Sequence, residues 1–90
     1  MKNEIKIKMV SAVNEALNFR KSQANNEEIL KHITKFVSSE KNKQTKLAMI
    51  ASVSRALNIA DTSKTKLRDK EIIKLTIKEL QSILENINKK

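Results

Sequence analysis

The chain has 90 residues, a formal net charge of +9, a sequence pI of about 10.0, and no Cys, Gly or Pro. The absence of Cys excludes disulfides and thiolate metal sites, and the absence of Gly excludes glycine-rich phosphate loops. Without Gly and Pro the common tight turns are missing and nothing interrupts a helix. The composition therefore predicts an all-α chain that forms one domain over residues 1–90.

The N-terminal stretch carries early positive charge, but its apolar run is broken by Asn14 and Glu15. We therefore expect neither a signal peptide nor a membrane span. Together with the lack of Cys, this favours a cytoplasmic protein that does not contact membranes.

The first two predicted helices form a hairpin. The first covers about residues 3–19, and 3–4 spacing gives it one inward face, made of Ile5, Met9, Ala12, Val13, Ala16 and Leu17. The second begins at residue 25 or 26 and ends at residue 38 or 39, and Asn25 with Glu28 predicts a capping box at its start. Its expected inward residues are Ile29, Leu30, Ile33, Phe36 and Val37.

The last two predicted helices form a second hairpin. The third covers about residues 45–60, with Leu47, Ile50, Val53, Ala56 and Leu57 inward. The fourth begins at residue 66 or 69, ends near residue 88, and is expected to be the longest. It carries a heptad seam with steps of 4, 3, 4 and 3, made of Ile73, Ile77, Leu80, Leu84 and Ile87. This seam either packs inside the bundle or forms an interface with a partner helix or a second copy.

The two hairpins resemble each other in sequence. Residues 6–19 and 46–59 align at an offset of 40 with 11 of 14 positions identical or similar, including Asn18 with Asn58. Residues 28–35 align with residues 71–78 at an offset of 43, although an offset of 44 is an alternative. Two hairpins are too few for a solenoid. We therefore predict a four-helix bundle with pseudo-twofold symmetry, built from repeats at about 6–40 and 46–88.

No set of residues predicts catalysis. His32 is the only His, lies between apolar positions, and is interpreted as a boundary or core residue. No Ser or Thr has a recognisable general base, and the ten carboxylates are scattered. We therefore expect no enzyme activity, no catalytic residue, no metal, no cofactor and no small-molecule substrate.

The connector between the third and fourth helices differs most from its counterpart. It is three residues longer than the connector between the first two helices and is richer in cations. Coding bias towards Lys would act on both connectors alike, so this difference is better evidence for function than the total charge. The predicted phosphate-binding residues are Thr62, Ser63, Lys64, Thr65, Lys66, Arg68 and Lys70. In an up-down bundle, Arg20 and Lys21 are expected at the same end, with Lys41 and Lys43 opposite.

Two functions fit these features. The first is a small basic regulator or packaging factor that holds the backbone of duplex DNA or RNA through residues 61–70. The second is a helical interaction module, such as an inhibitor, an antitoxin-like regulator or an assembly subunit, that binds a protein partner or a second copy through the seam of the fourth helix.

Overall fold

The computed structural model describes residues 2–63 and 66–88, and its four packed helices confirm the predicted all-α fold. The helices are α1 (Lys2–Arg20), α2 (Asn26–Phe36), α3 (Lys43–Thr62) and α4 (Asp69–Asn88), and a 3-10 turn, η1 (Val37–Ser39), follows α2. Both α3 and α4 have 20 residues, so α4 is not longer than α3.

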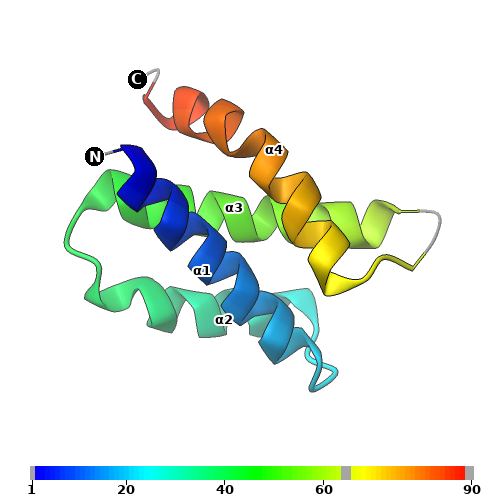
Figure 1. Ribbon diagram of the computed structural model, residues 1–90. Coiled ribbons are helices and arrows are strands. Elements are labelled where there is room, and N and C mark those ends of the chain that lie inside the picture. Colours follow the sequence, from blue (N-terminus) through cyan, green and yellow to red (C-terminus); the bar gives the residue numbers. More distant parts are fainter. Residues whose placement is uncertain (1, 64–65, 89–90) are drawn as a thin grey trace.

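The central pair is α1 and α3, and α2 and α4 lie on opposite sides of it (Figure 1). The α1–α2 and α3–α4 connectors lie at one end of the bundle, which we call the two-connector end. The α2–α3 connector lies at the opposite, one-connector end. The up-down topology predicted from the sequence is therefore present, and it brings residue 20 and the residues after α3 to the same end.

The cores of α1 and α3 are built from equivalent positions. At an offset of 40, five pairs of residues are buried in both helices: Met9 and Met49, Ala12 and Ser52, Val13 and Val53, Ala16 and Ala56, and Leu17 and Leu57. The Ser52 hydroxyl donates to the Ala48 carbonyl at 2.7 Å, which satisfies this polar group inside the core. The face predicted for the first helix is thus confirmed, with Ile5 half-buried at its edge.

Burial also distinguishes the two alignments of α2 with α4. At an offset of 43, three pairs of residues are buried in both helices: Ile29 and Ile72, Ile33 and Thr76, and Val37 and Leu80. An offset of 44 would instead pair the fully buried Ile33 with Ile77, whose side chain is 48% exposed. The pattern of burial therefore favours the offset of 43.

Two residues predicted to face inward are exposed, Phe36 at 39% and Leu47 at 53%. The α-helix ends at Phe36, and the tighter 3-10 turn that follows places Val37 in the core instead. On α3 the small residues Ala48 and Ser52 are fully buried, which permits close helix packing on that side and turns Leu47 outward.

The heptad seam predicted on α4 is only partly correct. Leu80 and Leu84 are buried, and Ile73 and Ile87 are half-buried. Ile77 is exposed. Ile72 and Thr76 take the buried positions, so the buried stripe advances in steps of four. Thr76 tolerates burial because its hydroxyl donates to the Ile72 carbonyl at 2.8 Å.

Candidate nucleic-acid interface

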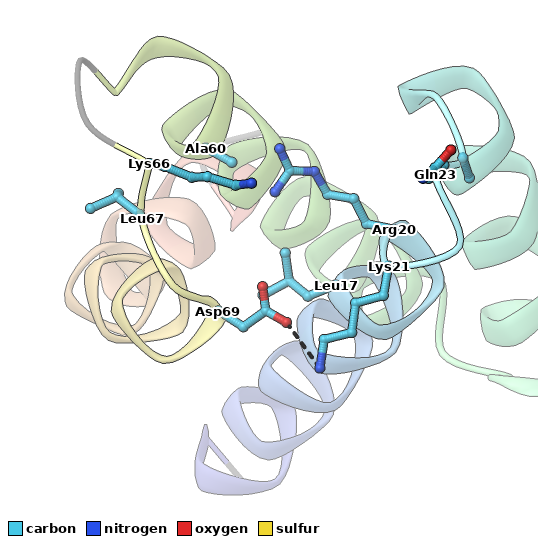
Figure 2. A pocket seen from close by; sticks show the side chains of 9 residues that line it. Leu17, Arg20, Lys21, Gln23, Ala60, Lys66, Leu67 and Asp69 are labelled. Carbon is cyan, nitrogen blue, oxygen red and sulfur yellow. Dashed lines mark ion pairs between the residues drawn. The ribbon is translucent and has the colours of Figure 1, made fainter.

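The two connectors at the two-connector end enclose a depression of about 440 Å³ (Figure 2). Arg20, Lys21 and Gln23 line it from the end of α1, and Lys66 and Asp69 line it from the start of α4. Gln23 has a φ of 69°, in the left-handed region that Gly adopts most readily. This conformation turns the chain toward α2. The structure thus brings Lys66 to Arg20 and Lys21, as the topology predicted.

Two carboxylates pair with the cations of α1: Asp69 lines the depression, and Asp61 lies outside its lining. The Lys21 ammonium lies 3.5 Å from Asp69, and the Arg20 guanidinium lies 3.9 Å from Asp61. Asp61 also accepts a hydrogen bond from the Asn26 side chain at 2.7 Å, which ties the end of α3 to the start of α2. These exposed ion pairs contribute little stability, but they reduce the charge that Arg20 and Lys21 offer to an anion.

The cations just before and at the start of α4 have fewer carboxylate partners than Arg20 and Lys21. Lys66, Arg68 and Lys70 are exposed and form no ion pair with the described residues. Lys66 and Arg20 extend toward one another from opposite sides of the depression (Figure 2). Two like charges that face each other across a hollow are favourable for an anion, because one phosphate between them would relieve their repulsion. Lys64 and Thr65 lie outside the described residues.

The structure describes two of the three residues whose hydroxyl groups were predicted to bind phosphate, Thr62 and Ser63. The Thr62 hydroxyl donates to the Asn58 carbonyl at 2.8 Å, so its proton is already used within α3. The Ser63 backbone N–H donates to the Ile59 carbonyl at 3.2 Å and ends that helix, and its side chain is half-buried. Thr62 is therefore a poor phosphate donor in this conformation.

The start of α4 has acidic residues that favour the helix and one cation, Arg68, that does not cap it. Asp69 and Glu71 lie in its first turn, where their negative charge suits the helix dipole. Glu71 also accepts the Arg68 backbone N–H at 3.0 Å, as Glu28 accepts that of Asn25 at 2.9 Å at the start of α2. In α2 the Asn25 side chain completes the capping box, whereas Arg68 has no acceptor atom that could do so.

The two-connector end as a whole is not strongly cationic. Its described cations are Arg20, Lys21, Lys66, Arg68 and Lys70, and its carboxylates are Glu27, Glu28, Asp61, Asp69 and Glu71. The cations left without an ion pair among the described residues of this end are Lys66, Arg68 and Lys70, and Asp69 and Glu71 alternate with them in sequence. Sequence reasoning missed the opposition because it weighed the cations of the second connector and gave no weight to Asp61 and Asp69 in the same stretch.

The predicted protein interface is smaller than expected, since only Ile77 among the seam residues is well exposed. Ile77 and Leu80 line an apolar groove of about 340 Å³ together with Lys6, Ile7 and Val10 of α1. Ile7 is 68% exposed, and sequence reasoning did not select it. Its position outside the 3–4 spaced inward set of α1 was the one available sign that it faces solvent.

His32 has a structural role in the described part of the chain. Its Nε2 lies 2.7 Å from a Glu15 oxygen, and its ring stacks on Phe19 with centroids 4.2 Å apart. These contacts join α1 to α2. The described residues contain no group of three or more acidic, His or Cys side chains placed to hold a metal ion.

No helix among the described residues combines the length and the apolar character needed to cross a bilayer. Comparisons with protein-family models, with curated proteins and with solved structures found no match.

Proposed function

We propose that this is a small, non-enzymatic, cytoplasmic protein that binds the phosphate backbone of duplex nucleic acid through residues 61–70. The observation that carries the proposal is the meeting of Lys66 with Arg20 and Lys21 around one depression. Lys66, Arg68 and Lys70 supply the phosphate contacts, while Asp61 and Asp69 hold Arg20 and Lys21 in place. We also infer that the two hairpins arose by duplication, which the matched burial in α1 and α3 supports.

Backbone contact fits the chain better than recognition of bases. The sequence has no Trp or Tyr, and its Phe19 is engaged in a stack with His32. Phe36 is partly exposed but lies at the end of α2 that is distant from the depression. Stacking on single strands needs a platform of exposed aromatic rings. Lys and Arg side chains instead contact phosphates without regard to sequence.

The test compares two variants that lose the same charge. K66Q/R68Q/K70Q removes the proposed contacts, and K31Q/K74Q/K78Q removes three exposed lysines elsewhere. With a short DNA duplex at low salt, we expect the first variant to lose at least about tenfold in affinity and the control to lose less than about threefold. Equal losses, or no binding by the wild-type protein, would show that the proposal is wrong.

A second function is favoured by the exposure of Ile7 and Ile77 in one groove. We propose that its occupant is an acidic amphipathic helix of another protein. Its apolar face would cover Ile7 and Ile77, and its carboxylates would meet Lys6 at the rim. A second copy fits less well, because each chain carries a net charge of +9.

This second proposal is tested with a synthetic helical peptide that carries Leu along one face and Glu along the other. I7S and I77S should weaken its binding, whereas L75S should not, since Leu75 is comparably exposed but does not line the groove. Equal effects of the three changes would contradict the proposal. A stable dimer in sedimentation that I77S dissociates would show that the occupant is a second copy.

A further inference from the structure

A second group of cations lies at the one-connector end. Glu40 in the α2–α3 connector accepts a hydrogen bond from the Lys8 ammonium at 2.7 Å. Lys8 and the Asn42 backbone N–H, which donates to Glu40 at 3.1 Å, lower the pKa of Glu40, and Lys46 in the first turn of α3 lowers it further. Lys41 and Lys43 are exposed beside it. We call Lys8, Lys41, Lys43 and Lys46 the one-connector cluster.

This end has a clearer excess of positive charge than the two-connector end. The first turn of α3 contains no acidic residue, unlike the first turns of α1, α2 and α4. The described cations at this end are Lys6, Lys8, Lys35, Lys41, Lys43 and Lys46, against the carboxylates Glu4, Glu40 and Glu85. Only Lys8 among these lysines forms an ion pair with a described residue. The surface is therefore suited to a polyanion.

The two cationic surfaces lie at opposite ends of the molecule. The bundle measures 34 × 25 × 20 Å, and its connectors project from the two ends (Figure 1). Duplex DNA is stiff, with a persistence length of about 150 bp. A duplex seated across one end is therefore too straight to curve back to the other end.

We propose that each end binds a separate duplex segment, so that one molecule bridges two duplexes. The proposal rests on the proposed function for the two-connector end and adds a second site to it. The alternative geometry is one duplex lying along the side of the bundle, since 34 Å is also about one helical turn of B-DNA. The two geometries differ in whether one protein molecule brings two duplexes together.

The experiment mixes two short DNA duplexes, one labelled with a donor dye and one with an acceptor dye. Wild-type protein should give energy transfer between them, and sedimentation of the free protein should show a monomer. K41Q/K43Q/K46Q should lower the transfer at least about tenfold and reduce the number of duplexes bound per protein molecule from two to one, because the two-connector end still binds. K31Q/K74Q/K78Q, which loses the same charge, should retain the transfer.

The outcomes separate this inference from the proposed function. Wild-type protein that binds one duplex but gives no transfer would overturn bridging and leave the proposed function standing. A wild-type protein and a K41Q/K43Q/K46Q variant that both bind one duplex per molecule, the variant more weakly, would show that one duplex contacts both ends. A wild-type protein that binds no duplex would overturn both.

Discussion

Ile72 and Ile77 lie five positions apart on α4 and have opposite environments. Ile72 is fully buried in the main core cluster, whereas Ile77 is 48% exposed. Both belong to one wide apolar face, and a stripe of this width leaves the rotation of the helix open by tens of degrees. Close packing against the small residues of α3 selects the rotation that buries Ile72.

Truncation of these two residues tests that rotation. Ile72→Ala should lower the free energy of unfolding by about 2–5 kcal/mol, because it removes buried methylenes and leaves a cavity. Ile77→Ala should lower it by less than about 1 kcal/mol, since its side chain already contacts water. Urea unfolding followed by circular dichroism measures both values. If Ile77→Ala costs as much as Ile72→Ala, the packing face of α4 is assigned incorrectly.

At the scale of the helices, the residues at the start of α4 are interpreted to serve both helix capping and anion binding. Its Glu71 makes half of a capping box, and Arg68 occupies the position where an Asn completes the box in α2. A cation at this position is unfavourable for the helix dipole and supplies no cap. We interpret Arg68 as a residue retained for anion binding at a small cost in stability.

Arg68→Asn tests this interpretation by two readouts. The change should raise the free energy of unfolding by about 1 kcal/mol, because Asn both caps the helix and removes an unfavourable charge. The same variant should bind duplex DNA more weakly. Asn25→Ala is the matched control, expected to cost about 1 kcal/mol without weakening binding. A more stable Arg68→Asn variant with unchanged affinity would contradict a functional role for Arg68.

The Lys8–Glu40 contact joins α1 to the α2–α3 connector and predicts a pH effect. Lys8 lowers the pKa of Glu40, chiefly through the 2.7 Å hydrogen bond, so folding favours the ionised carboxylate. This contribution is present at neutral pH and is lost as the pH falls below about 4.5, the ordinary value for Glu.

Denaturant titrations between about pH 3 and pH 7 measure this effect. Glu40→Gln should flatten the acid-side fall in stability slightly, and Lys8→Gln should flatten it less, because the Asn42 backbone N–H still donates to Glu40 and favours its ionised form. Acid dependence identical to that of the wild-type protein in both variants would show that the pair contributes nothing in solution.

At the scale of the whole molecule, much of the architecture could be predicted from the sequence. Helical periodicity located the four helices, and up-down topology placed Arg20 and Lys21 beside the residues after α3. Helix rotation could not be predicted, because it depends on how closely small residues such as Ala48 and Ser52 let neighbours approach. The exposure of Leu47, which the sequence predicts to face inward, follows from that rotation.

The ion pairs that determine the charge at each end of the bundle could not be predicted from the sequence either. Asp61 and Asp69 oppose Arg20 and Lys21 only because two distant connectors meet at one end. The one-connector cluster likewise brings Lys8 of α1 to Glu40 in the α2–α3 connector. Such groupings arise from tertiary structure and have no counterpart in the spacing of residues along the chain.

The salt dependence of binding to a single short duplex tests the central claim most directly. Each phosphate contact contributes about 0.9 to the slope of log affinity against log salt concentration. K66Q/R68Q/K70Q should therefore reduce the slope by about 2.7, whereas R20Q/K21Q should reduce it by less than about 1, because these two cations are already ion-paired. A slope unchanged in K66Q/R68Q/K70Q, or reduced equally in both variants, would contradict backbone binding through residues 61–70.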